Sequence, residues 1–235
     1  VPRVPWRLPD QRVVKRRLLE GRAGGAGYGV KRNGQPAVKI LDTVGCEIMR
    51  GQNLGVIGES GAGKSTLARV ISGVLKPYAG DIVFDGKQLG SSLHERQKEE
   101  LRRIQFVFQL ADTALNPRHS IHQIIGRPLE FFYGLKGDAQ EKRVCELLDM
   151  VRLPGATRHR LPGELSGGQK QRINLARALA AKPEMLLCDE ITSALDTVVV
   201  AAVLDLLKEL QRELGMTYLF ISHDMSVVRH MSDRI

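Results

Sequence analysis

The chain has 235 residues, of which 43% are hydrophobic and 26% are charged, and its formal net charge is +9. These values exclude a disordered chain and predict one large globular domain, or one domain that carries a subdomain. The apolar runs are all shorter than the roughly 18 residues that a membrane-spanning helix needs. The three cysteines are widely spaced, which argues against a disulfide framework or a zinc site and favours a reducing compartment.

Most of the positive charge lies near the start of the chain. Residues 1–36 carry nine Lys and Arg side chains against two carboxylates, Asp10 and Glu20. Prolines and the glycine-rich run at 21–29 accompany these charges and predict a flexible basic linker over residues 1–27. Contact of this tail with anionic lipid or with nucleic acid is the alternative interpretation.

Apolar runs and amphipathic segments alternate through the rest of the chain. The runs predict strands over residues 37–49, 54–57, 80–86, 104–108, 185–188 and 217–221. Helical patterns cover residues 66–72, 94–103 and 197–214. Continuous apolar strands that alternate with helices predict an α/β fold with a mostly parallel sheet covered on both faces.

The segment from residue 110 to about 180 has a different character, because apolar strand patterns are missing from it. Ser120 can cap a helix that runs through Phe132, and Asp138 can cap a second one. A third helix is predicted from Ser166 to about Ala181. We therefore expect a helical subdomain that is inserted into the α/β core.

The stretch Gly58–Thr66, GESGAGKST, fits the pattern G-x-x-x-x-G-K-[ST] and lies between a predicted strand and a predicted helix. Glycines allow successive backbone N–H groups to turn toward one anion, and the helix N-terminus adds its positive end. Lys64 can reach the β- and γ-phosphates, and the Ser65 hydroxyl can bind Mg²⁺. A chance match in a glycine-rich turn is the alternative, but the strand and helix around it favour a phosphate-binding loop for a nucleoside triphosphate.

Polar side chains follow three further predicted strands, and ligands of parallel sheets bind at the carboxyl ends of strands. Asp189 is the candidate for holding Mg²⁺, and Glu190 is the candidate general base for the attacking water. Gln109 could coordinate Mg²⁺ or orient water, and His223 could contact the γ-phosphate. Taken alone, each of these residues is equally compatible with an ordinary polar strand end.

A second glycine-rich segment, Leu165-Ser-Gly-Gly-Gln169, begins a predicted helix. Ser166 can cap this helix, and the two adjacent glycines expose backbone N–H groups to a second anion. A glycine-rich helix cap without a ligand is the alternative for the segment alone.

These segments together carry a family resemblance. LSGGQKQR at 165–172, between the phosphate-binding loop and MLLCDE at 185–190, resembles the signature of ATP-binding cassette (ABC) transporter ATPases. Gln109, SALD at 193–196 and His223 follow in the family's order, so the resemblance covers about residues 28–235. GESGAGKST, LNPR at 115–118 and CDE followed by SALD look like the peptide/nickel-type importers.

The resemblance implies a P-loop NTPase core with an N-terminal antiparallel strand region, and it implies ATP and Mg²⁺ as cofactors. The implied catalytic residues are Glu190, His223, Gln109 and Lys64, and the implied metal ligands are Ser65, Gln109 and Asp189. Tyr28 would stack on adenine, and Asp196 would lie at a dimer interface. The residues implied to bind the phosphates within the chain are Gly58, Glu59, Ser60, Gly61, Ala62, Gly63, Lys64, Ser65 and Thr66. The residues implied to bind ATP held by the opposite subunit are Ser166, Gly167, Gly168 and Gln169.

The implied function is that of an ATP-hydrolysing subunit that energises import of peptides or a related small solute across the bacterial inner membrane. Such a subunit sits peripherally on the cytoplasmic face. Its expected partners are a second ATPase subunit, identical or paralogous, an integral permease bound through about residues 110–135, and indirectly a solute-binding protein. Nucleic acid is not expected.

Two other functions stay open from the sequence. One is a cassette ATPase without a transport role, associated with nucleic acid or with an enzyme complex, which the basic tail favours. The other is a module that clamps ATP without turnover. Because the family normally continues beyond this chain's last residue, we also expect a truncated C-terminal end that leaves a sheet edge uncovered.

Overall fold

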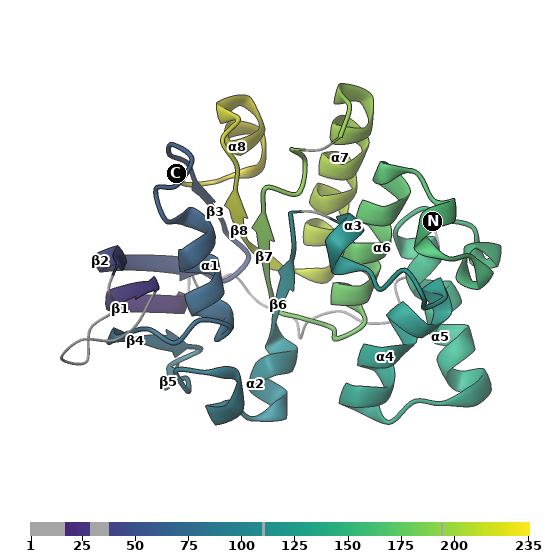
Figure 1. Ribbon diagram of the computed structural model, residues 1–235, viewed down its shortest axis with the longest axis horizontal. Helices are drawn as coiled ribbons and strands as arrows, with labels where there is room; N and C mark the ends of the chain where they lie inside the picture. The colour runs from purple at the N-terminus through teal and green to yellow at the C-terminus, as the bar shows by residue number, and fades with distance from the viewer. Residues whose placement is uncertain (1–16, 29–37, 110, 194) are drawn as a thin grey trace.

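The computed structural model describes residues 17–28, 38–109, 111–193 and 195–235 and contains two sheets. The antiparallel sheet has the order β2-β1-β4-β5 and the parallel sheet the order β3-β8-β7-β6 (Figure 1). The strands of the antiparallel sheet are β1 (Arg17–Tyr28), β2 (Val38–Met49), β4 (Ala79–Phe84) and β5 (Lys87–Gln88). The strands of the parallel sheet are β3 (Asn53–Val56), β6 (Ile104–Val107), β7 (Met185–Asp189) and β8 (Thr217–Ile221).

Helices fill the space between and beside these strands. The α-helices are α1 (Lys64–Ser72), α2 (Lys98–Arg103), α3 (Ala111–Ala114), α4 (Ile121–Tyr133), α5 (Gly137–Met150), α6 (Gly167–Leu179), α7 (Thr197–Leu214) and α8 (Met225–Met231). The 3-10 helices are η1 (Leu93–Glu95), η2 (Gly155–His159) and η3 (Pro162–Glu164). The α/β fold predicted from the sequence is thus confirmed.

The parallel sheet separates two hydrophobic cores, because successive side chains of a strand point to opposite faces. In β7, Met185 and Leu187 join the core formed with α1 and the antiparallel sheet. Their neighbours Leu186 and Cys188 join the core formed with α4 to α7. Figure 1 accordingly shows α1 with the antiparallel strands on one side of the parallel sheet and α6 with α7 on the other.

Between β6 and β7 the described residues form helices, turns and loops and no strand. Ser120 caps α4, and its hydroxyl accepts a hydrogen bond from Gln123 N. The prediction that Asp138 caps α5 is wrong by two positions. This helix begins at Gly137 with Lys136 in the cap position, and Asp138 lies in the first turn, where a carboxylate suits the helix dipole.

The predicted linker over residues 1–27 is wrong for residues 17–27, which belong to β1 between β2 and β4. The glycines there serve close packing: a Cβ on Gly25 would lie 2.5 Å from Cζ of Tyr78, and one on Gly21 would lie 3.3 Å from Sγ of Cys46. The strand is bulged between Gly21 and Gly27, where glycine is common. Residues 1–16 of the predicted tail lie outside the described residues.

The sheet edge expected to be uncovered at the end of the chain is partly covered. Arg234 forms a parallel bridge with Leu54 of β3, and its carbonyl accepts a 2.7 Å hydrogen bond from Gly55 N. Asp233 also accepts a hydrogen bond on its carboxylate from Asn53 N at 2.7 Å. The last residues therefore run along β3.

Four charged side chains join the two sheets at the amino ends of the parallel strands. Glu184, just before β7, forms ion pairs with Arg50 at 2.6 Å and with Arg103. Asp85, just after β4, forms ion pairs with the same two arginines at 2.9 and 2.7 Å. Burial alone would raise the pKa of Glu184, but the hydrogen bonds from Arg103 and Arg50 outweigh it and hold that pKa below its ordinary value.

We predict that Glu184→Gln lowers the free energy of unfolding at pH 7 by about 2 kcal/mol, because two arginines lose a charged acceptor. A carboxylate with a depressed folded-state pKa stabilises above its unfolded pKa, and this stability is lost as pH falls below about 4. The variant should therefore lose less stability than the wild type between about pH 5 and about pH 3. Urea unfolding across this range measures both effects.

Glu130→Gln is the matched control, since Glu130 forms an exposed ion pair with Lys136 and should contribute less than about 0.5 kcal/mol. Equal loss in the two variants at pH 7 would contradict the role given to this partly buried network.

Candidate active site

The loop between β3 and α1 carries the phosphate-binding motif. Gly63 precedes α1 with φ 92° and Gly61 has φ 85°, a backbone conformation that side chains disfavour. A Cβ on Gly63 would also lie 2.9 Å from Cδ2 of Leu41 and 3.0 Å from Cγ2 of Ile40. The loop conformation therefore requires glycine at 63 twice over, for its dihedral angle and for its contact with β2.

The two polar residues that begin α1 point to different partners. Lys64 is buried, and its Nζ donates hydrogen bonds of 2.8 Å to the carbonyls of Gly58 and Glu59. An ammonium has three N–H donors, so one more remains for a phosphate oxygen. Ser65 Oγ donates a 2.9 Å hydrogen bond to Oδ1 of Asp189.

Asp189 ends β7 and is 5% exposed. Burial raises the pKa of this carboxyl, the hydrogen bond from Ser65 lowers it, and the neighbouring Glu190 charge raises it again. The net pKa lies above the ordinary value, so a cation next to Asp189 would relieve a carboxylate that is costly to ionise.

The donor set fits Mg²⁺. Ser65 and Asp189 offer hydroxyl and carboxylate oxygens side by side, which are the hard ligands that Mg²⁺ takes. Within the described ranges no three His, Cys, Asp or Glu side chains form a metal site of their own. Mg²⁺ in phosphate sites commonly uses one or two protein oxygens and completes its shell with phosphates and water.

Glu190 follows β7 and contacts the polar residues that follow the two neighbouring strands, β6 and β8. Its Oε2 accepts a 2.9 Å hydrogen bond from Nε2 of Gln109, which follows β6. The same oxygen lies 3.6 Å from Nδ1 of His223, which follows β8. Glu190 has φ 46°, a left-handed conformation that costs a non-glycine residue about 1–3 kcal/mol and is common at functional sites.

These four strand ends form one cluster, as the parallel sheet predicted. Val56, Ile221 and Asp189 are paired across β3, β8 and β7, so the phosphate-binding loop starts level with the acidic pair. The cluster brings together a phosphate-binding loop, two oxygens for a hard cation, and a carboxylate held by an amide and an imidazole. Such an arrangement can bind a triphosphate and activate water.

The second glycine-rich segment lies elsewhere. Ser166 caps α6, and Ser166 and Gln169 exchange backbone and side-chain hydrogen bonds of 3.4 and 3.0 Å. A Cβ on Gly168 would lie 2.5 Å from Cγ1 of Val199, so glycine permits close approach to the start of α7. Asp196 caps α7 by accepting a 2.9 Å hydrogen bond from Val199 N.

This segment therefore clusters with Asp196 and is separated from the phosphate-binding loop by the sheet. The apolar side of α6, with Ile173, Leu175 and Leu179, belongs to the core on the face opposite α1. The structure groups the predicted residues into two sets, one at the strand ends and one at the start of α6.

Tyr28 ends β1 and is 41% exposed. Its hydroxyl accepts a 3.1 Å hydrogen bond from Arg69 of α1. The predicted adenine-stacking residue is thus tied to the helix that begins at the phosphate-binding loop, with ring surface open to solvent.

Comparison with known proteins places these features in a family. The family described as ABC transporter matches residues 41–193. The chain belongs to the ABC transporter family. It is 44% identical to the oligopeptide transport ATP-binding protein AppF of Bacillus subtilis, over 84% of this chain and 60% of that protein. It is 41% identical to OppF of Lactococcus lactis, over 84% and 62%. The chain spans about three fifths of the length of these curated relatives.

Solved ABC structures share the fold. The dimeric ATP-binding cassette MJ0796 in a post-hydrolysis state, bound to ADP and Pi, aligns with a TM-score of 0.80 and 31% identity over 91% of both chains. CbiO1 of Clostridium perfringens, part of the ABC transporter complex cbiONQ, aligns with a TM-score of 0.78 and 30% identity over 92% of this chain and 82% of that one.

Sequence reasoning gave no role to two side chains that hold this ABC site in place, although one of them, Ser193, belongs to the SALD segment. Buried Asn174 of α6 donates a 3.1 Å hydrogen bond to the carbonyl of Phe108, next to Gln109. Ser193 donates to the carbonyl of Glu190 at 2.9 Å and accepts from Gln109 at 3.4 Å. Their signal is weak in the sequence, because a single Asn inside a helix or Ser after a strand has many ordinary roles. Only the fold brings them to the site.

We predict that Glu190→Gln retains ATP binding and lowers hydrolysis by about 100-fold or more, because an amide cannot accept the proton of the attacking water. The amide oxygen can still accept the hydrogen bond from Gln109, so the local geometry should persist. Phosphate release from the assembled complex and binding of a fluorescent ATP analogue measure the two effects.

Glu213→Gln on α7, far from the strand ends, is the control for this change and should hydrolyse ATP at the wild-type rate. If Glu190→Gln also kept the wild-type rate, another group would have to be the base.

Proposed function

We propose that the chain is the ATP-binding and ATP-hydrolysing subunit of an ABC importer for peptides or a related small solute. The observation that carries the proposal is the cluster of Ser65 with Asp189 and of Gln109 with Glu190 and His223 beside the phosphate-binding loop. The curated relatives named as oligopeptide transport proteins support the solute class.

In the proposed reaction, the amides of the loop and the free N–H of Lys64 bind the phosphates of ATP. Ser65 and Asp189 would hold Mg²⁺, which neutralises phosphate charge. Glu190 takes a proton from water, while Gln109 and His223 orient its carboxylate from two sides. Tyr28 offers its exposed ring to the adenine.

The position of the signature segment supports a second subunit. Since α1 and α6 pack on opposite faces of the parallel sheet, the exposed start of α6 serves a phosphate bound by another chain. In a head-to-tail dimer, Ser166, Gly167, Gly168 and Gln169 of one subunit would close over the ATP of the other, with Asp196 at the interface. Closure would complete the site and hydrolysis would release it. The dimeric MJ0796 cassette supports this arrangement.

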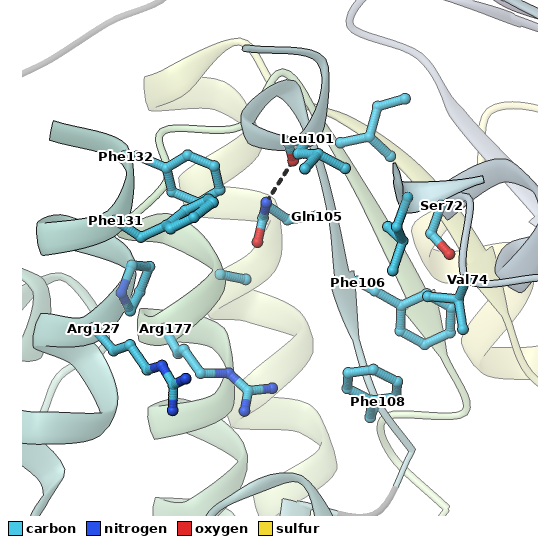
Figure 2. Close-up of a pocket in the computed structure, with 14 residues that line it drawn as sticks. Ser72, Val74, Leu101, Gln105, Phe106, Phe108, Arg127, Phe131, Phe132 and Arg177 are labelled. Carbon is cyan, nitrogen blue, oxygen red and sulfur yellow. Dashed lines mark hydrogen bonds between the residues drawn. The ribbon is translucent and has the colours of Figure 1, made fainter. Parts of the chain in front are cut away.

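A groove beside α4 supports the proposed contact with a permease through about residues 110–135. It has a volume of about 430 Å³ and is lined by α4, α6, β6, α2 and the end of α1 (Figure 2). Phe131 is 54% exposed in it and Phe108 is 41% exposed. No described helix has both the length and the apolar character needed to cross a membrane. We propose that an integral subunit forms the solute path and that this chain binds it from the cytoplasmic face.

We predict that Ser166→Arg abolishes the ATP-dependent dimer, because a bulky cation would fill the place of the facing γ-phosphate. Size-exclusion chromatography with ATP, in the Glu190→Gln background to prevent turnover, should show a monomer. Ala156→Arg adds the same charge on an exposed 3-10 turn and should still dimerise. A dimer of the Ser166→Arg variant with ATP would refute the two-chain site.

We predict that Phe131→Asp reduces co-purification of the integral subunits at least about tenfold, because a carboxylate would enter an apolar contact. Val38→Asp is the control, since Val38 is equally exposed, at 56%, but lies at the start of β2. Recovery of the wild-type chain only in complexes with DNA or RNA, and never with membrane proteins, would favour the non-transport alternative.

A further inference from the structure

Arg69 of α1 connects the base end of the proposed nucleotide site to its phosphate end. Its Nη1 donates a 3.1 Å hydrogen bond to the hydroxyl of Tyr28, the last residue of β1. Ser65, four positions earlier on α1, donates to Asp189 at 2.9 Å. Residues four apart lie on the same side of a helix, about one turn from each other. One side of α1 therefore contacts Asp189 at the phosphate end and Tyr28 at the base end.

The strand around Tyr28 does little to fix the orientation of its ring. Gly27, the residue before it, has no side chain, and the register of β1 shifts between Ala26 and Gly27. Tyr28 is paired with Val38 of β2, but these two side chains are 41% and 56% exposed. Among the described residues, the hydroxyl of Tyr28 has one hydrogen bond, the bond from Arg69. This bond restrains the ring at its far end.

The bond from Arg69 suits a ring that stacks on a planar base. A hydrogen bond at the hydroxyl lies at the edge of the ring and leaves its faces free, and stacking uses a face. Arg69 is itself exposed on α1 and has no ion pair with a carboxylate in the described part of the chain. The phenol hydroxyl is therefore the described side-chain partner of this guanidinium.

We propose that Arg69 is a positioning residue that orients the ring of Tyr28 for the adenine base. It acts through Tyr28 and does not itself contact the nucleotide. The proposal rests on the function proposed above, in which Tyr28 stacks on adenine, and it names the residue that orients this ring. Without the bond, an exposed ring would sample several rotamers, and ordering it on binding would cost affinity. With the bond, one helix sets the spacing between the base contact and the phosphate contacts.

The test compares binding of ADP and of pyrophosphate to the full chain, each with Mg²⁺. Neither ligand carries a γ-phosphate, and they differ by the adenosine group. ADP therefore reports on the base and phosphate contacts together, whereas pyrophosphate reports on the phosphate contacts alone. Isothermal titration calorimetry gives both dissociation constants. Because the phosphates bind at the start of α1, pyrophosphate binding also shows whether a variant keeps this helix and its loop folded.

Arg69→Met should weaken ADP binding about threefold, because methionine keeps an apolar stem but cannot donate a hydrogen bond. Tyr28→Phe should weaken it by a similar factor, since phenylalanine keeps the ring but cannot accept the bond. The double variant should lose no more than either single variant, because both changes remove the same bond. All three should bind pyrophosphate as the wild type does. Arg212→Met, which removes an exposed arginine from α7, should leave both affinities unchanged.

Tyr28→Ala separates the positioning proposal from the stacking on which it rests, and it should weaken ADP binding about tenfold. Unchanged ADP binding by Tyr28→Ala would overturn both the stacking and the positioning. A loss in Tyr28→Ala, with wild-type ADP affinity in Arg69→Met and Tyr28→Phe, would overturn the positioning alone.

Two further results would contradict a role of Arg69 through Tyr28. Additive losses in the double variant would mean that Arg69 contacts the nucleotide directly. Weaker pyrophosphate binding by Arg69→Met would mean that Arg69 supports the fold of α1. The Glu190→Gln hydrolysis assay is independent of these measurements, so failure here is distinguishable from failure of the proposed ATPase.

Discussion

The hydrogen bond from Ser65 to Asp189 joins the two elements on which the site depends. Ser65 belongs to the first turn of α1 and Asp189 to the end of β7, and β8 lies between β7 and β3. The bond forms only if Val56, Ile221 and Asp189 stand level across the three parallel strands. A shift of one residue in β7 would turn Asp189 toward the other face and bring Glu190 to its place. The register of the buried sheet therefore determines which side chains meet at the carboxyl ends of its strands.

The groups at the carboxyl ends of the parallel strands destabilise the folded state, whereas the charges at the amino ends stabilise it. Adjacent carboxylates, a buried Asp189 and a left-handed Glu190 all disfavour the folded state. At the amino ends of the same strands, Glu184 and Asp85 are paired with two arginines that connect the sheets. The two ends of the parallel strands thus have opposite electrostatic roles, and the apolar strands between them hold the strained site in place.

Much of this architecture could be predicted because its signals are local. The strand before a glycine loop, the apolar run before Asp189 and the cap at Ser120 each depend on neighbouring residues. The prediction for the run from Gly21 to Tyr28 was wrong, because composition alone cannot separate a flexible linker from a bulged strand. Its glycines are explained by Tyr78 and Cys46, which come from other strands and turns. The bond from Asn174 to Phe108 likewise joins residues 66 positions apart, and no local pattern encodes such a contact.

The sheet that connects Ser65 to Asp189 also separates α1 from α6. This separation explains why the proposed site takes its signature segment from a second chain. One chain brings its phosphate-binding loop next to Asp189 and Glu190 but has its signature segment on the other face of the sheet. The groove lies where the two faces meet, since Val74 and Phe106 line it from the side of α1 and Phe131 and Arg177 from the side of α4 and α6. Arg177, which lines the groove, donates a hydrogen bond to Asn174, and Asn174 donates to the carbonyl of Phe108, next to Gln109. In the proposed complex, a permease segment in the groove would therefore lie close to the hydrogen bonds that lead to Gln109, which donates to Glu190.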